Sequence, residues 1–202
     1  MPDAGQPGLR CLVVFAHPLG DSLNGRLCRF VCERLSASGH DVDLLDLYAE
    51  DYDPRLTADE RRLFGKSAPE PLPSPDAGRL AEAELLVLVF PTWWFAMPAI
   101  MKGWIDRTFA PGVAYHEDGK GGPIRPGLTG LRRMLVVTTL GSPWWLARIV
   151  MREPLRRTLR LGVAKACAPQ ARFRMLSLYG AETADEKRIA AFEARIVTAL
   201  PG

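Results

Sequence analysis

Apolar and amphipathic segments alternate along the chain, and this alternation predicts its secondary structure. Continuous apolar runs, typical of strands buried on both faces of a sheet, occur at 9–16, 41–47, 84–90, 133–139 and 171–178. Amphipathic patterns that predict helices lie near 22–38, 76–82, 97–109, 147–162 and 183–199. This order predicts an α/β fold with a five-stranded parallel sheet, right-handed crossovers and helices on both faces.

The remaining segments predict loops around a single domain. Residues 48–75 are rich in proline and charge, and we expect a long connection that covers the edge of the site, with one helical turn at 57–64. The glycine-rich residues 119–130 predict a loop leading into the fourth strand. The chain can bury one sizeable core, which we place at 9–200 as a single domain, after a loose N-terminal tail at 1–8.

The passage from the third strand into the third helix carries the clearest functional signal. Pro91 ends the apolar run, residues 92–95 form a turn with three consecutive aromatic side chains, and Pro98 stands where a first helical turn tolerates proline. Three consecutive aromatic side chains on a turn cannot all face one way, so at least one borders open space. Because parallel sheets bind ligands at their carboxyl edge, we expect a pocket here for a flat ring with hydrogen-bonding groups.

The loop after the first strand predicts a phosphate site. Ser22 is a good N-cap residue, Asn24 lies in the first helical turn, and the free N–H groups of a helix start attract anions. His17 can donate to an anion while it bonds the loop backbone. The bland alternatives are a polar strand-end residue for His17 and simple helix capping for Ser22 and Asn24. The dinucleotide fingerprint GxGxxG is absent, and a loop of hydroxyl and amide groups is the flavodoxin type of phosphate site.

These motifs resemble a known family. The segments AHPLGDSLN at 16–24 and FPTWWFAMPAIMKGWIDRTF with GVAY at 90–115 are similar to those of the NAD(P)H:quinone oxidoreductases. The similarity continues through DLLDLYAEDYDP at 43–54 and TTLG at 138–141. The resemblance covers nearly the whole chain and implies a two-electron flavoenzyme with a flavodoxin-like fold.

The resemblance also implies a cofactor and the residues that hold it. The flavin is FAD or FMN, the electron donor is NADH or NADPH, and the acceptor is a quinone or a related electrophilic aromatic compound. Hydride passes to the flavin and then, in the emptied pocket, to the acceptor, which is a ping-pong mechanism. The backbone N–H groups of Trp94 and Phe95 bond the N5 and O4 edge of the flavin. The expected cofactor-binding residues are His17, Ser22, Leu23, Asn24, Pro91, Thr92, Trp93, Trp94, Phe95, Thr138, Thr139 and Gly141.

Two departures from the family pattern affect this interpretation. Leu140 replaces the first of two glycines after the paired threonines, which disfavours a positive φ there but keeps a backbone N–H donor. A tyrosine and a histidine that several relatives place beside the flavin have no obvious counterparts in SPWWLARIVMREP. Trp144 and Trp145 stand there instead and, with Tyr115, are the expected substrate pocket. We therefore nominate no side-chain general acid.

A homodimer is expected from the apolar surface of helix 97–109 together with Trp144 and Trp145. This helix carries more apolar residues than one sheet face needs: Met97, Ile100, Met101, Trp104, Ile105 and Phe109. Relatives form two-fold homodimers in which both subunits border the flavin, so the resemblance implies a closed, isologous dimer with a shared site.

Composition narrows the remaining choices. The formal net charge of +3 gives no reason to expect nucleic acid, and no apolar run approaches the 18 residues of a membrane span. The four cysteines lack CxxC spacing and, with no signal peptide apparent, predict reduced thiols in a cytoplasmic protein. The three histidines are far apart in sequence, and we expect no metal site.

Some alternatives stay open at this level. Arginines at 148, 152, 156 and 160 form a basic stripe if one helix carries them all, although Pro154 favours a second helix from Leu155. Such a stripe is a solvated face, a contact for the NADPH phosphate or an acidic substrate, or an anionic-surface contact. The main functional alternative is a regulatory flavoprotein subunit of a potassium-efflux system that senses quinones. A one-electron carrier is a third, which the positive charge disfavours.

Overall fold

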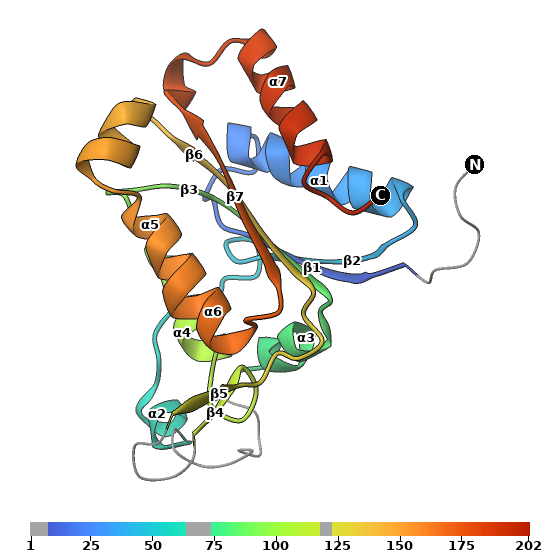
Figure 1. Cartoon of the computed structure of the whole chain (residues 1–202), viewed down its shortest axis with the longest axis vertical. Coiled ribbons are helices and arrows are strands. Elements are labelled where there is room, and N and C mark those ends of the chain that lie inside the picture. Colours follow the sequence, from blue (N-terminus) through green and yellow to red (C-terminus); the bar gives the residue numbers. More distant parts are fainter. Residues whose placement is uncertain (1–7, 64–73, 118–122) are drawn as a thin grey trace.

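The computed structural model describes residues 8–63, 74–117 and 123–202, and its centre is a five-stranded parallel sheet (Figure 1). The strands are β1 (Arg10–Phe15), β2 (Asp41–Asp46), β3 (Leu85–Pro91), β6 (Arg133–Leu140) and β7 (Arg172–Tyr179). Their order in the sheet is β2-β1-β3-β6-β7. The strand order changes direction at β1 and β3, so the carboxyl ends of these two strands border the crevice where such sheets bind ligands.

Helices cover both faces of the sheet, as the alternating pattern predicts. On one face, α1 (Leu23–Ala37) and α7 (Glu186–Val197) pack Leu27, Val31 and Phe192 against one side of the strands. On the other face lie α3 (Asp76–Glu82), α4 (Ala99–Thr108), α5 (Pro154–Arg157), the π-helical segment η2 (Thr158–Ala164) and α6 (Lys165–Cys167). The predicted flavodoxin-like α/β architecture is confirmed.

The central strands have continuous apolar sequences because they are buried on both faces. All seven residues of β3 are buried, with alternate side chains in the two cores. The edge strand β2 is largely exposed, and its aspartates interrupt the apolar pattern. The chemical difference between central and edge strands is therefore already present in the sequence.

The predicted loop at 119–130 is partly wrong. Ile124–Pro126 forms β5, which pairs antiparallel with β4 (Tyr115–Glu117). Strands of three residues are too short to give a hydrophobic period, so the sequence pattern could not reveal them. Residues 118–122 lie outside the described part of the chain.

The predicted helix 147–162 is interrupted. A π-helical segment, η1 (Leu146–Val150), ends before Arg152 and Glu153, which have φ of 55° and 48°, and α5 then begins at Pro154. Proline has no N–H group and disfavours α conformation at the residue before it, so it begins a new helix. The prediction that a second helix begins near Pro154 is confirmed, although it begins at Pro154 and not at Leu155.

The connection after β2 runs alongside α4. The helical turn expected at 57–64 is present as α2 (Ala58–Leu63). Pro54 packs so closely on Gly103 of α4 that a Cβ there would lie 2.2 Å from the Pro54 carbonyl oxygen, and Arg107 of α4 pairs with Glu60. Residues 54–63 thus run towards the amino edge of the sheet, and the expectation that they cover the site is wrong (Figure 1). Residues 64–73, like 1–7 of the expected tail, lie outside the described chain.

Helix α4 is a core helix. Met101 and Trp104 are completely buried and Ile105 nearly so, and the Trp104 Nε1 donates to the buried Asp76 Oδ2 at 3.1 Å. The argument for an interface is therefore wrong for Met101, Trp104 and Ile105, which are buried within one chain, whereas Met97, Ile100 and Phe109 are only half-buried. Among the described helices, none combines the length and the apolar character needed to cross a bilayer.

Candidate functional site

The loop between β1 and α1 presents unused backbone donors. Ser22 caps the helix by accepting from the Gly25 N–H at 3.1 Å, which confirms its expected capping role. The first bond of the helix runs from the Arg26 N–H to the Ser22 carbonyl, so the N–H groups of Leu23 and Asn24 have no partner within the helix. A helix start with free N–H groups and a capping hydroxyl can bind a phosphate.

His17 orders this loop. Its Nδ1 lies 3.0 Å from both the backbone nitrogen and the carbonyl oxygen of Leu19, so the ring bonds the loop backbone in either tautomer. The ring centroid is 6.4 Å from that of Trp93, and thus the loop after β1 lies beside the turn after β3. The structure brings these two sequence motifs together at the carboxyl edge of the sheet.

Asn24 carries a polar atom with no partner. The side chain is 4% exposed, and its Nδ2 donates to the Thr139 Oγ1 at 2.8 Å, which ties α1 to β6. Its Oδ1 is buried and has no hydrogen-bond partner among the described residues. A buried acceptor without a donor costs about 1–3 kcal/mol, so the site favours a ligand that brings a donor.

The turn after β3 is strained and aromatic. Trp93 and Ala96 exchange backbone hydrogen bonds of 3.0 and 2.9 Å, while Trp94 and Phe95 have φ of 52° and 58°. Such left-handed residues cost about 1–2 kcal/mol each and are held only where the surroundings require them. The N–H groups of Trp94 and Phe95 are not used within the turn, and the Trp94 side chain is 97% exposed. The expected open aromatic side chain is therefore Trp94.

Threonines join the ends of β3 and β6 beneath this turn. The Thr92 N–H donates to the Thr139 carbonyl at 2.7 Å, and the hydroxyls of Thr92 and Thr138 are 2.8 Å apart. Pro91 lies opposite Thr139 in the register of the two strands. All the predicted cofactor residues of β3 and β6 thus lie at one edge, next to Asn24.

The next residues are Leu140 and Gly141. Leu140 is 8% exposed and has no positive φ, as expected for a leucine in place of a glycine. A Cβ on Gly141 would lie 2.9 Å from the Glu182 Oε1. The carboxylate of Glu182, which belongs to the short helix η3 (Ala181–Thr183), therefore lies directly beside Gly141.

The three expected substrate-pocket residues lie at opposite edges of the sheet. Trp144 and Trp145 are 56% and 49% exposed and follow β6 at the carboxyl edge. Tyr115 lies in β4, whose partner strand β5 contacts α6 just before β7 begins, and this is the amino edge of the sheet. Within one chain Tyr115 therefore does not join the other site residues.

The structure places two further residues at the site that the sequence pattern did not single out. Tyr179 ends β7, and Glu153 lies in the bend before α5. Both line a small cleft with Thr92, Phe95 and Leu140. The position of Tyr179 at a strand end, just before a glycine, was the available signal. Glu153 gave none, because its position depends on the left-handed bend.

Arg148, Arg152, Arg156 and Arg160 do not form one stripe. Arg148 and Arg156 both approach the Glu153 carboxylate, at 3.5 and 3.7 Å, from opposite sides of the bend. The bend separates Arg148 from the helix that begins at Pro154.

Cys11 and Cys167 are two of the buried cysteine thiols. Burial raises the pKa of Cys11 to about 12 and that of Cys167 to about 11, so these two thiols are unreactive. All four cysteines are unbridged. Within residues 8–63, 74–117 and 123–202, no three histidine, cysteine or acidic side chains form a group that could hold a metal ion.

Comparisons with known proteins agree with this arrangement. A sequence model of the flavodoxin-like fold family matches residues 10–197. A ribosyldihydronicotinamide dehydrogenase-like protein of Penicillium crustosum is 36% identical over 157 residues, covering 66% of this chain and 58% of that protein. An uncharacterized NAD(P)H oxidoreductase of Haemophilus influenzae is 33% identical over 134 residues, covering 65% of this chain and 64% of that protein.

Solved structures share the fold over almost the whole chain. An NAD(P)H:quinone oxidoreductase from Methanothermobacter marburgensis superposes with a TM-score of 0.78 at 24% identity, covering 95% of each chain. The protein Smu.1420 from Streptococcus mutans superposes with a TM-score of 0.77 at 27% identity, covering 93% of this chain and 96% of that one. The match spans only about three fifths of the first curated relative. By its family match and its fold, the chain belongs to the flavodoxin-like fold family.

Proposed function

We propose that this protein is a flavin-dependent NAD(P)H oxidoreductase that reduces quinones or related electrophilic aromatic compounds by two electrons. The observation that carries the proposal is the meeting of two binding elements at neighbouring strand ends. One is the helix start with unused N–H groups, and the other is the left-handed aromatic turn. The names of the relatives, which include NAD(P)H oxidoreductases and quinone dehydrogenases, support the same conclusion.

The loop after β1 fits a flavin phosphate. The N–H groups of Leu23 and Asn24, the Ser22 hydroxyl and an imidazole N–H of His17 are all donors, and a phosphate has only acceptors at neutral pH. The Arg29 guanidinium donates to the Gly20 carbonyl at 2.9 Å and holds this loop from outside. FMN and FAD share the first phosphate, so this fit supports either cofactor.

The aromatic turn and the threonines fit the flavin ring. The N–H groups of Trp94 and Phe95 would donate to its polar edge, while Pro91, Thr92 and Trp93 shape its seat. Thr138, Thr139 and the backbone at Gly141 border the other edge. Bound flavin would supply the hydride chemistry, with NADH or NADPH as the donor. Because donor and acceptor would use the same open face beside Trp144 and Trp145, we propose a ping-pong order.

We also propose that the protein works as a homodimer. Its remaining support is the exposed apolar surface beside the site, which includes Trp144, Trp145, Ile149 and Val150, at 49–64% exposure. A two-fold partner that covers this surface could bring its own Tyr115 region near the site, which would reconcile the expected pocket with the position of Tyr115 in one chain.

The test is cofactor binding followed by turnover. Protein stripped of cofactor should bind FMN or FAD with a rise in melting temperature and then oxidise NADH or NADPH only when a quinone is present. Binding of neither flavin, measured by fluorescence titration and by thermal shift, would contradict the proposal. Binding of flavin without turnover would instead favour a regulatory role.

A further inference from the structure

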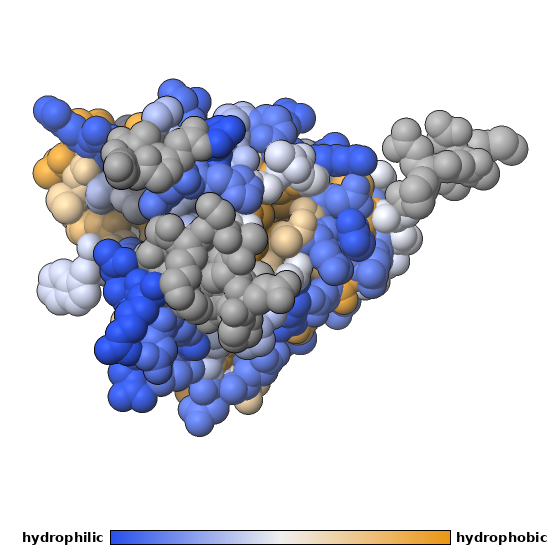
Figure 2. Space-filling view, turned by 90° about the horizontal axis from the view of Figure 1, so that it is seen from below, coloured by the Kyte–Doolittle hydropathy of each residue, from blue (hydrophilic) through white to orange (hydrophobic). Residues whose placement is uncertain are grey.

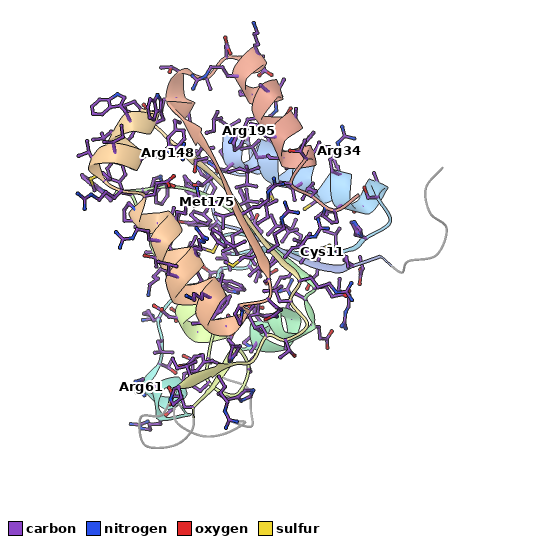
Figure 3. The ribbon with its side chains drawn as sticks, in the orientation of Figure 1. Cys11, Arg34, Arg61, Arg148, Met175 and Arg195 are labelled. Atoms are coloured by element: carbon purple, nitrogen blue, oxygen red, sulfur yellow. The ribbon has the colours of Figure 1, made fainter. Side chains whose placement is uncertain are left out.

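Reduction of a quinone to a hydroquinone consumes a proton as well as a hydride, and the cleft beside the flavin seat contains a residue that can supply one. The cleft has a volume of about 30 Å³, which is enough for one water molecule. Thr92, Phe95 and Leu140 of the proposed site line it together with Tyr179 and Glu153. Figure 3 labels Met175 on β7, which lines the cleft, and Arg148 on η1, which approaches the Glu153 carboxylate.

The backbone around Glu153 is held in an unfavourable conformation. Arg152 and Glu153 are consecutive non-glycine residues with positive φ, and the Glu153 N–H donates to the Ala147 carbonyl at 2.9 Å to close the bend. Glu153 is at the N-cap position of α5, but its side chain makes no capping bond. The Glu153 Oε1 lies instead 3.5 Å from the Tyr179 hydroxyl.

The charges around the phenol come from three elements. Arg148 on η1 and Arg156 on α5 flank the Glu153 carboxylate, and Arg188 on α7 donates to the Tyr179 carbonyl. Burial, followed by the charge of Glu153, raises the pKa of Tyr179. The phenol therefore keeps its proton at neutral pH, when a proton donor needs it.

We propose, resting on the function proposed above, that Tyr179 donates the proton that completes acceptor reduction and that Glu153 is the residue that positions its hydroxyl. The acceptor receives a hydride that originates from NAD(P)H, the Tyr179 O–H bond breaks, and the proton goes to the acceptor oxygen. Water returns a proton to the phenolate, so the tyrosine is unchanged over a turnover. A hydroquinone is itself a phenol, with a pKa near the value of about 10 for free tyrosine, so only the raised pKa of Tyr179 opposes the transfer.

The decisive experiment compares two acceptors in Tyr179→Phe. Duroquinone needs a proton, and its four methyl groups block addition to thiols, whereas ferricyanide accepts electrons without a proton. We expect Tyr179→Phe to slow duroquinone reduction by about tenfold or more and to leave ferricyanide reduction unchanged. Tyr48→Phe, a tyrosine at the end of the opposite edge strand, is the matched control and should leave both rates unchanged.

A second measurement needs no cofactor. Ultraviolet difference titration of the protein without flavin, with Tyr179→Phe as the reference, gives the ionisation of this phenol. Glu153→Gln should lower the pKa of Tyr179, because it removes the charge that helps to raise it. It should also shift the pH profile of duroquinone reduction in the same direction.

The outcomes are distinct. If Tyr179→Phe slows the reduction of duroquinone and of ferricyanide equally, or slows neither, the role of Tyr179 is overturned. An unchanged Tyr179 titration in Glu153→Gln would overturn the role of Glu153. Wild-type protein that binds flavin but reduces neither acceptor would overturn the proposed function and not the pair, whose titration stands apart from turnover.

Discussion

Asn24 shows how a single residue serves both the fold and the site. Its Nδ2 ties α1 to Thr139, while its Oδ1 is buried without a donor among the described residues. The protein without cofactor therefore carries the desolvation cost of that oxygen, and a ligand donor that reaches it removes the cost. Helix capping explains Ser22 but does not explain Asn24, because the cap bond comes from Ser22 alone.

We expect Asn24→Ala to weaken flavin binding by about 1–3 kcal/mol, because the ligand loses its acceptor. Isothermal titration with FMN and with FAD measures this change, and circular dichroism checks the fold. Ser36→Ala, on the same helix but at its far end, is the control and should bind flavin like the wild type. Flavin affinity equal to the wild type in Asn24→Ala would reduce Asn24 to a link between α1 and β6.

At the scale of the element, the interpretation of α4 changes from an interface helix to a core helix once the fold is known. Its sequence is apolar enough to resemble an interface helix, yet Trp104 is completely buried and bonds Asp76. Helix α3, which carries Asp76, is only seven residues long. The bond between Trp104 and Asp76 holds α3 to α4, and Arg79 of α3 pairs with Asp43 of β2.

Trp104→Phe should lower the free energy of unfolding by about 2–3 kcal/mol, because it leaves a small cavity and removes a donor from the buried Asp76. Urea denaturation measures the change. The exposed Trp94→Phe, at 97% exposure, should change it by no more than about 0.5 kcal/mol in the protein without flavin. The oligomeric mass should be unchanged in Trp104→Phe, and a monomer would revive the interface interpretation of α4.

The link between α3 and β2 predicts a dependence of stability on pH. Hydrogen bonds from Arg79 lower the pKa of Asp43 in the folded protein. Its contribution is therefore present above the unfolded pKa of about 3.9 and is lost as the pH falls through the folded pKa. Because the Asp43 side chain is half exposed, Asp43→Asn should cost less than about 1 kcal/mol at pH 7. The difference from the wild type should shrink towards zero in urea titrations at the lowest pH, and a constant difference would contradict the assignment.

At the scale of the molecule, hydrophobic residues gather on the side of η1 and α5, whereas the face seen from below is mostly hydrophilic (Figure 2). The apolar side chains of η1 project next to the site, with Trp145 just before them. This arrangement is costly for an isolated chain and supports the proposed dimer.

If two chains share this surface, Trp145→Glu should convert the dimer into a monomer, because a buried unpaired carboxylate costs several kcal/mol. Light scattering at micromolar concentration reads the mass. Trp145→Tyr should keep the dimer, since it keeps an aromatic ring. A wild-type protein that is a single chain, binds flavin and turns over would exclude the shared-site dimer.

The sequence determined the succession of strands and helices along the chain, because buried strands require apolar runs and helices on a sheet require one apolar face. It also determined the two motifs at the ends of β1 and β3, since the chemistry of a helix cap and of an aromatic turn is local. Only the tertiary structure decided that Tyr115 lies at the opposite edge, that Trp104 is internal, and that Glu153 faces Tyr179. Those outcomes depend on which distant segments pack together, and on a left-handed bend whose cost is offset by contacts far away in sequence.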